Sequence, residues 1–263
     1  MVAELLPAAY LTHGGGPCFF MDWNPPHEWD GLRAALEGIG PSLGGDPAAI
    51  LVVTAHWESE VFAIGAAARP ELIYDYGGFP PHTYQLTYPA PGSPALAAQV
   101  AELLAGAGIA HRVDPTHGWD HGVFIPLKVM YPDATIPVVA LSVRADLDPR
   151  AHLELGRALA PLRSQGVLIV GSGSSFHHFG NFGREDFAVP FDGWLHEVLA
   201  RPNDERWAAL ADWTAAPFAR QAHAREEHLV PLMVAAGAAT DAPARTIFRA
   251  RVLGTTMSCW LFD

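Results

Sequence analysis

The chain has 263 residues, with 16 lysines and arginines against 28 aspartates and glutamates, so its formal net charge is −12. This balance argues against a nucleic-acid-binding protein and against a polybasic membrane anchor, because both need a basic surface. Half of the residues are hydrophobic and 17% are charged, which is typical of a folded globular protein and excludes a disordered chain.

Short apolar runs alternate with longer helical stretches, which is the pattern of an α/β protein. Two of the runs, 50–53 and 167–170, are continuously apolar, as expected for strands that helices cover on both faces. In chain order the predicted elements are strand 8–11, helix 28–37, strands 49–54 and 61–66, helices 93–107 and 121–130, strand 136–141, helix 149–162, strand 167–170, helices 192–199, 206–212 and 227–236, and strand 246–252.

The sequence contains no internal repeat, low-complexity tract or linker, so we predict one α/β domain over residues 1–263. Its central sheet is expected to be mostly parallel or mixed and flanked by helices. No apolar run approaches the roughly 18 residues of a membrane span, and we expect no signal peptide. Cys18 and Cys259 are the only cysteines, too few for a disulfide framework, so we expect a reducing cytoplasm.

The 13 histidines are unusually many beside 16 lysines and arginines. Predicted strands are followed by His13, by His56 and by the pair His177-His178. Because sites in open α/β sheets form at the carboxyl ends of strands, we expect these side chains to meet there. Further along the chain, His121 and His228 begin predicted helices.

A cluster of imidazoles predicts a metal site at the carboxyl ends of the strands. Two or three imidazoles with an oxygen ligand suit Fe, Zn, Cu or Ni better than Mg or Ca. No His-Glu-x-x-His motif occurs, so the ligands must come from distant segments. Trp57, Trp119 and Phe79 lie near these histidines in the sequence and are candidates for an aromatic substrate pocket, although core packing is the commoner role of such residues. The Pro- and Gly-rich segment 74–92 is predicted to be a pocket wall.

Eight segments in order along nearly the whole chain carry a resemblance to a known family. They are His13-Gly14-Gly15-Gly16-Pro17, Thr54-Ala55-His56-Trp57, Asp75-Tyr76-Gly77-Gly78-Phe79-Pro80, Tyr88-Pro89-Ala90-Pro91-Gly92-Ser93-Pro94, Trp119-Asp120-His121-Gly122, Met130-Tyr131-Pro132-Asp133-Ala134, Gly171-Ser172-Gly173 through His177, and Glu227-His228-Leu229-Val230-Pro231-Leu232. Each is a weak signal alone, but the ordered set resembles the class III extradiol dioxygenases of the LigB-like superfamily, in particular the 4,5-DOPA-dioxygenase-like branch.

The resemblance implies a mononuclear non-haem Fe(II) enzyme that opens the ring of a catechol-type, DOPA-like substrate with O2. It implies His13 and His56 as metal ligands. For the third ligand it suggests His228, while Glu226 and Glu227 stay open as alternatives.

The same resemblance implies catalytic roles for two further histidines. His177 matches the acid–base histidine of the superfamily and could also reach the metal in a resting state. His121 matches a histidine that lies near the substrate, outside the metal ligands. Departures at Gly15-Gly16 and at Ser174-Ser175-Phe176 bear on the substrate, so the sequence leaves open which catechol is cleaved and on which side of the diol.

Two other functions remain as alternatives. The same histidines could hold Zn(II) in a hydrolase, and zinc could also replace iron in a resting or crystallised form. A non-catalytic metal-binding relative is the second alternative. The expected partners are a small catechol and O2, with no nucleic acid and no membrane, for a chain that acts as a monomer or homodimer.

Overall fold

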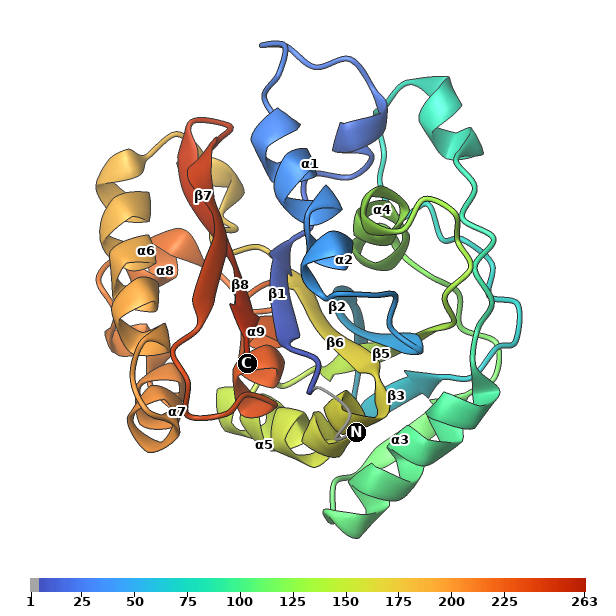
Figure 1. Ribbon diagram of the computed structural model, residues 1–263. Helices are drawn as coiled ribbons and strands as arrows, with labels where there is room; N and C mark the ends of the chain where they lie inside the picture. The colour runs from blue at the N-terminus through green and yellow to red at the C-terminus, as the bar shows by residue number, and fades with distance from the viewer. Residues whose placement is uncertain (1–4) are drawn as a thin grey trace.

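One mixed β-sheet of eight strands, in the order β4-β3-β5-β2-β6-β1-β8-β7, organises the computed structural model, which describes residues 5–263 (Figure 1). The strands are β1 (Ala8–Thr12), β2 (Ala49–Ser59), β3 (Phe62–Gly65), β4 (His111–Asp114), β5 (Val138–Arg144), β6 (Val167–Gly173), β7 (Arg245–Val252) and β8 (Thr255–Phe262). The four central strands β5, β2, β6 and β1 are parallel. Antiparallel pairing joins β3 to β5, β8 to β1, and β7 to β8, so the predicted mixed sheet is confirmed.

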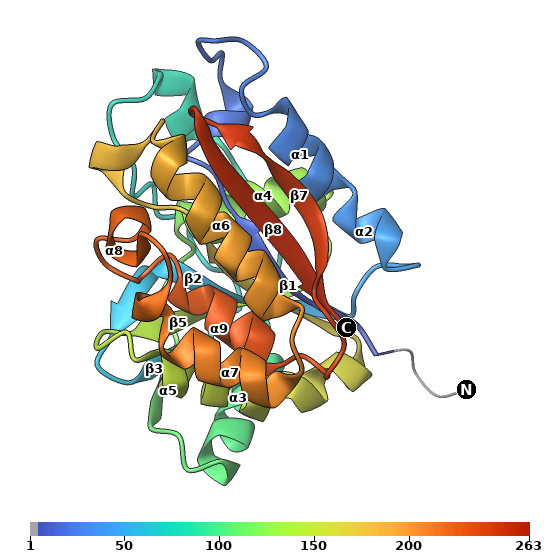
Figure 2. The ribbon, with the colours of Figure 1, turned by 90° about the vertical axis from the view of Figure 1, so that its left-hand side faces the viewer.

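Helices cover both faces of the sheet. They are α1 (Asp30–Glu37), α2 (Ile39–Ser42), α3 (Pro94–Gly106), α4 (His121–Met130), α5 (Pro149–Leu159), α6 (Glu185–Leu199), α7 (Asn203–Ala211), α8 (Ala219–Ala222) and α9 (Val230–Gly237). Figure 2 shows α1 and α2 on the side of the sheet opposite to α9 and α5. The strands β1, β2 and β6 between these layers are buried, which explains their continuously apolar sequences. Within residues 5–263, no helix has both the length and the apolar character to span a membrane.

Several elements differ from the sequence prediction. Strand β4 was not predicted, because its sequence His-Arg-Val-Asp is polar and lies at the half-exposed edge of the sheet. Strand β8 was also missed, since Thr, Ser and Cys interrupt its apolar residues although nearly all of it is buried. Helix α6 begins seven residues before the predicted start, and α9 begins three residues after it.

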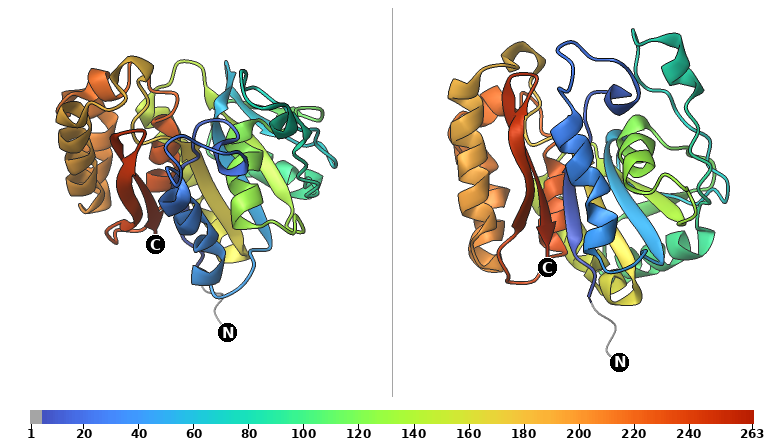
Figure 3. Two further views of the ribbon diagram at one scale, coloured as in Figure 1. Left: turned by 90° about the horizontal axis from the view of Figure 1, so that it is seen from above. Right: turned by 45° about the horizontal axis from the view of Figure 1, so that its top comes forward.

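The carboxyl ends of the parallel strands form one edge of the sheet, at the top of Figure 1. Figure 3 shows this edge from above and obliquely, with the loop after β1 in blue and the β7–β8 hairpin in red rising from it. The segments that follow β1 and β6 therefore begin side by side. This edge is where the sequence placed its histidines.

Outside this group of histidines, His152 of α5 is completely buried beside the end of β5, with both ring nitrogens in hydrogen bonds. Its Nδ1 donates to the Asp148 carbonyl at 2.7 Å, and its Nε2 accepts from the Arg144 amide at 3.1 Å. Burial lowers the pKa of His152 from 6.5 to about 4. The folded protein therefore keeps this imidazole neutral at a pH where the unfolded chain would protonate it.

We expect His152 to make the fold sensitive to mild acid. The unfolded chain takes up this proton below about pH 6.5, and the folded protein takes it up below about pH 4. The contribution of the neutral imidazole to the free energy of unfolding is therefore complete above about pH 6.5. It is lost as the pH falls toward 4, by up to about 1.4 kcal/mol per pH unit. The variant His152→Gln should therefore have a free energy of unfolding that falls less steeply between these pH values. Urea unfolding at several pH values measures this slope, and an unchanged slope would contradict the assignment.

Candidate metal centre

His13 is the first residue after β1, and its direction is set by the backbone on both sides. Its amide donates to the Gly173 carbonyl at the end of β6, at 3.0 Å. Directly after it, Gly14 has φ +90°, and a Cβ there would overlap the Cys18 sulfur. Only glycine adopts this conformation at no steric expense, so the chain can turn away sharply and leave the His13 side chain buried at the edge of the sheet.

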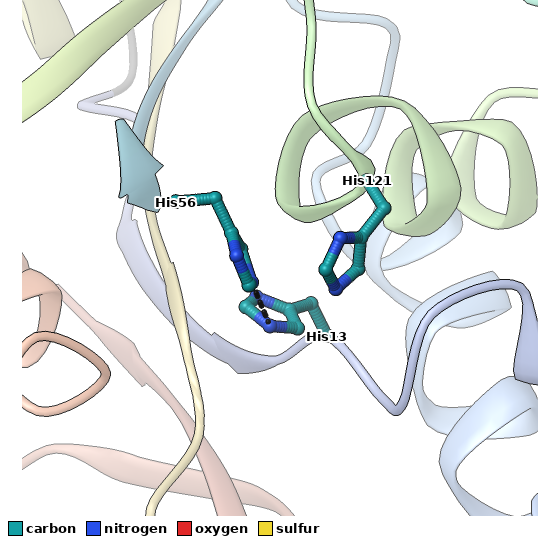
Figure 4. Close-up of side chains that lie close together, drawn as sticks. All are labelled: His13, His56 and His121. Carbon is teal, nitrogen blue, oxygen red and sulfur yellow. Dashed lines mark hydrogen bonds between the residues drawn. The ribbon is translucent and has the colours of Figure 1, made fainter. Parts of the chain in front are cut away.

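His56 lies within β2 and is carried by a β-bulge. Between Thr54 and Glu58 the pairing with β5 advances by only one residue, from Ser142 to Val143. Extra residues in one strand bend it and redirect its side chains, which is a recurrent device next to active sites. The bulge turns His56 toward His13, and their Nε2 atoms are 3.1 Å apart (Figure 4).

Three more histidines reach the same place from other elements. His121 begins α4 and points at His13 and His56 in Figure 4. His177 follows β6, and its amide donates to the Ala222 carbonyl at 2.9 Å. His228 precedes α9, and its carbonyl accepts the Tyr10 hydroxyl at 2.8 Å. Together we call His13, His56, His121, His177 and His228 the five-histidine cluster.

The Gly171-Ser172-Gly173 segment forms the end of β6. A Cβ on Gly173 would overlap the His228 carbonyl oxygen, so glycine allows the segment before α9 to pack directly on the strand. Ser172 points the other way, as alternate strand residues do, and meets His13. The motif therefore positions His13 and His228.

The Nδ1 atom of His13 is held by Ser172. Ser172 Oγ lies 2.9 Å from His13 Nδ1 and donates its own hydrogen to the Gly122 carbonyl. The serine can therefore only accept from the imidazole, which fixes the proton of His13 on Nδ1. Its Nε2 is left as a bare lone pair.

Two carboxylates hold the other four imidazoles in the same way. Asp75 Oδ1 accepts from His121 Nδ1 at 2.8 Å, and Asp75 Oδ2 lies 3.4 Å from His56 Nδ1. Glu227 Oε1 lies 3.0 Å from the Nδ1 of His228 and 3.3 Å from that of His177. All five Nδ1 atoms of the five-histidine cluster therefore face an oxygen, and the Nε2 atoms of His13 and His56 face each other.

Burial sets the charge state of the cluster. Burial, with a smaller contribution from the neighbouring imidazoles, lowers the pKa of His13 and His56 well below the ordinary value and that of His228 to about 4. Burial works against ionisation of Asp75 and Glu227, but hydrogen bonds from their histidines outweigh it and the pKa of each carboxyl is lowered. At neutral pH His13, His56 and His228 are therefore neutral, the form that binds metals, beside two carboxylates.

The arrangement fits a metal ion between three of these rings. Two bare nitrogens 3.1 Å apart repel each other, whereas nitrogens bound to one ion are about 3.3 Å apart at a tetrahedral angle. Rings that radiate from one ion, with each nitrogen about 2.1 Å from it, have centroids about 5 Å apart. The centroids of His13, His56 and His228 are 4.9, 5.3 and 4.9 Å apart.

His121 and His177 fit such a shared ion less well. The His121 ring lies only 4.0 Å from that of His56, and the His177 ring stacks on that of His228 at 3.5 Å. Nitrogen positions alone also group His13 with His56 and His121, whose ligand atoms lie within 4.8 Å of one another. Ring spacing therefore favours His228 and nitrogen proximity admits His121 as the third ligand.

The two glutamates that the sequence left open lie in different surroundings. Glu226 pairs with Arg220 at 2.6 Å, away from the five-histidine cluster. Glu227 is in contact with two histidines of the cluster, as described above. Its place beside their Nδ1 atoms is that of an orienting carboxylate.

A cavity of about 490 Å³ opens over the five-histidine cluster, and all five rings line it. Phe79 and Tyr76 of the predicted wall segment 74–92 also line it. Trp57 and Trp119 do not, although both were candidates for the substrate pocket. Trp57 stacks on His117 at 3.6 Å, and Trp119 is buried with its ring 6.1 Å from that of Tyr88. Both tryptophans therefore pack in the core behind the cavity.

Asp75, Ser172 and Glu227 are the positioning residues that the sequence did not assign. Asp75 lies 46 residues from His121, and Ser172 lies 159 residues from His13, so only the fold brings them together. A signal was present for Glu227, which directly precedes His228. For Asp75 the only hint was its place at the start of a long Pro- and Gly-rich segment.

We expect Ser172→Ala to weaken metal binding while the protein stays folded. The substitution removes the oxygen that fixes the proton of His13 on Nδ1, and loss of such a partner typically lowers metal affinity by about 10–100-fold. Competition with a chromophoric chelator measures the affinity. Ser174→Ala is the matched control, because Ser174 Oγ donates to the Phe176 carbonyl and contacts no histidine. Equal affinities for the two variants would remove Ser172 from the site.

Residues 7–257 match the family described as the catalytic LigB subunit of aromatic ring-opening dioxygenase. A 4,5-DOPA dioxygenase extradiol of Beta vulgaris is 44% identical over 238 residues, which cover 88% of this chain and 86% of that protein. A protein of the same name from Escherichia coli K12 is 33% identical over 244 residues, which cover 90% of this chain and 87% of the relative.

The likeness extends to a solved structure. The crystal structure of an uncharacterized protein from Escherichia coli K12 matches with a TM-score of 0.81 and 28% sequence identity. The match covers 98% of this chain and 100% of that chain. The fold described above is therefore shared over nearly all of this chain and the whole of that chain.

Proposed function

The chain belongs to the LigB family of aromatic ring-opening dioxygenases, and from that premise we propose that it opens the ring of a catechol-type substrate with O2. In this extradiol reaction a carbon–carbon bond beside the diol breaks, both oxygen atoms enter the product, and the product is a muconic semialdehyde. One observation carries the proposal: three imidazoles at metal-binding spacing and two further imidazoles share one aromatic-walled cavity.

We propose His13, His56 and His228 as the ligands of an Fe(II) ion. Their ring spacing and their burial support this set. Zinc has no redox chemistry, whereas a divalent iron bound here would bring catechol and O2 together and pass electrons from the catechol to O2. Ser172, Asp75 and Glu227 hold the three rings through their Nδ1 atoms.

His177 is proposed to move protons and His121 to hold the substrate. The Nδ1 of His177 faces Glu227, so its Nε2 is the atom that can accept a proton from a catechol hydroxyl and later return it. Asp75 holds His121 so that its Nε2 can hydrogen-bond to an oxygen of the bound catechol. The aromatic rings of Tyr76 and Phe79 flank the cavity beside His121 and suit a flat ring.

The test is anaerobic loading with Fe(II), followed by O2 and a panel of catechols. We expect consumption of one O2 per catechol and a yellow semialdehyde, and we expect neither with the Zn(II)-loaded protein. No consumption with any catechol, from protein that retains its iron, would contradict the proposal. Hydrolytic activity with Zn(II) in the absence of O2 would instead support a zinc hydrolase.

A cytoplasmic location stays part of this proposal. Cys18 and Cys259 are both free and buried, which is how cysteines are commonly kept in a reducing compartment. The expectation that the chain acts as a monomer or a homodimer stays a prediction.

A further inference from the structure

We propose that the cavity selects catechols whose ring substituent is apolar and uncharged. The inference rests on the proposed ring-opening function and names the substrate class for the same site. It is carried by the wall of the cavity on the His177 side and by the distribution of charge around it.

That wall is built from the loop after β6 and from the β7–β8 hairpin. Phe179 and Phe182 come from the loop after β6, with their rings 6.0 Å apart, and the Phe179 ring lies 5.0 Å from that of His177. Leu253 and Met257 come from the β7–β8 hairpin. We call Phe179, Phe182, Leu253 and Met257 the apolar wall.

The apolar wall is fixed at its base and open at its rim. Met257 is buried, and the Leu253 amide donates to the Glu28 carboxylate, which ties the hairpin turn to the segment before α1. Phe179 is 82% exposed, the largest exposure among the big apolar side chains of residues 5–263. An exposed phenylalanine beside an active-site histidine offers a surface that an apolar substituent would cover.

Charge around the cavity points to the same substrate class. Over the described residues 5–263 the cavity is lined by no lysine or arginine, and its one carboxylate is Asp75. A carboxylate on the substrate would therefore lose water without gaining a cationic partner, which is unfavourable. The net charge of −12 also works against an anionic substrate on its approach to the protein.

The arginines near the rim already have other partners. Arg225 pairs with Glu58 through both guanidinium nitrogens at 2.5 Å. Arg251 donates to the Gly254 carbonyl at 3.3 Å and lies 3.8 Å from Glu185. Neither lines the cavity, so neither is placed to receive a substrate carboxylate.

The test compares two ligands of nearly equal shape, 4-propylcatechol and 3-(3,4-dihydroxyphenyl)propanoate, which differ in a terminal methyl or carboxylate. Binding to the Fe(II)-loaded protein is measured by calorimetry without O2, and kcat/KM is measured separately by O2 uptake. We expect the propyl compound to bind at least about 10-fold more tightly and to have the higher kcat/KM. Lengthening the alkyl chain should raise affinity by about fourfold for each methylene that the apolar wall covers.

A charge introduced into the apolar wall should narrow this preference. Leu253→Arg places a cation at the half-exposed rim and should reduce the ratio of the two affinities by about fivefold, the size of an exposed ion pair. Val189→Arg is the matched control, because it adds the same charge on an exposed face of α6 away from the cavity. The control should leave the ratio unchanged.

The outcomes separate this inference from the proposed function. Equal or tighter binding of the propanoate would overturn the inference and would direct attention to the backbone amides of Gly14–Gly16 as carboxylate donors. Turnover of either compound would in that case still support the ring-opening function. If neither compound is cleaved although the propyl compound binds more tightly, the ring-opening proposal fails and the preference of the cavity stands. An affinity ratio in Leu253→Arg equal to that of the wild type would show that the apolar wall does not contact the substituent.

Discussion

Replacing His228 with alanine is expected to abolish stable metal binding, whereas replacing His121 with alanine is expected to leave the metal bound. Loss of a ligand should weaken the affinity by more than the about 100-fold that follows loss of an orienting partner. Metal content after dialysis, and affinity by chelator competition, measure the difference. Both variants remove one imidazole from the same cavity, so each serves as the control for the other.

The physical basis of this difference is the spacing of rings around one point. The His228 ring lies about as far from the rings of His13 and His56 as these two rings lie from each other, which is the arrangement expected of three ligands around one ion. His121 lies against His56 and shares the carboxylate of Asp75 with it. If His121→Ala loses the metal and His228→Ala retains it, the ligand set is the one that nitrogen proximity alone indicates.

The sequence was sufficient to predict the histidines at the strand ends. An apolar run followed by a histidine places that side chain at the carboxyl edge of a parallel sheet wherever the strand lies in the order, so His13 and His177 needed no knowledge of pairing. His56 was also predicted, but as a residue beyond the strand. In fact β2 continues through it, and the bulge that turns it depends on the pairing with β5.

The partners of the histidines could not be read in the same way. Asp75 and Ser172 act through contacts across the fold, and neither has a sequence neighbour that reveals its role. The same limit explains why Trp57 and Trp119 were candidates for the substrate pocket although neither lines the cavity. They lie close to the site along the chain, but strand and loop geometry direct them into the core, where their large apolar surface is buried.

Strand β8 shows a second limit of sequence patterns. Its residues are buried on both faces, yet polar ones such as Ser258 lie among them because they form buried hydrogen bonds. Ser258 Oγ donates to Asp192 at 2.6 Å, and its amide donates to Ser175 Oγ at 2.8 Å. A hydrophobic pattern cannot reveal a strand whose polar groups are satisfied by distant side chains.

Replacing His177 with alanine is expected to lower kcat by about 10²–10⁴-fold while the metal stays bound, because a positioned proton-transfer group contributes a factor of this size. Turnover is measured by O2 uptake with Fe(II)-loaded protein. Metal content must be measured alongside it, since the His177 ring stacks on that of the proposed ligand His228. His178→Ala is the matched control, because His178 is the next residue and does not line the cavity.

A further variant separates proton transfer from substrate binding. His177→Asn keeps a polar group that can hydrogen-bond to Glu227 or to a catechol hydroxyl, but it cannot exchange a proton with the substrate. If His177 moves protons, the asparagine variant should lose kcat as fully as the alanine variant, with KM little changed. If His177 only binds the catechol, asparagine should restore most of the activity, and the difference should appear in KM. The comparison therefore tests the role of the residue and not only its presence.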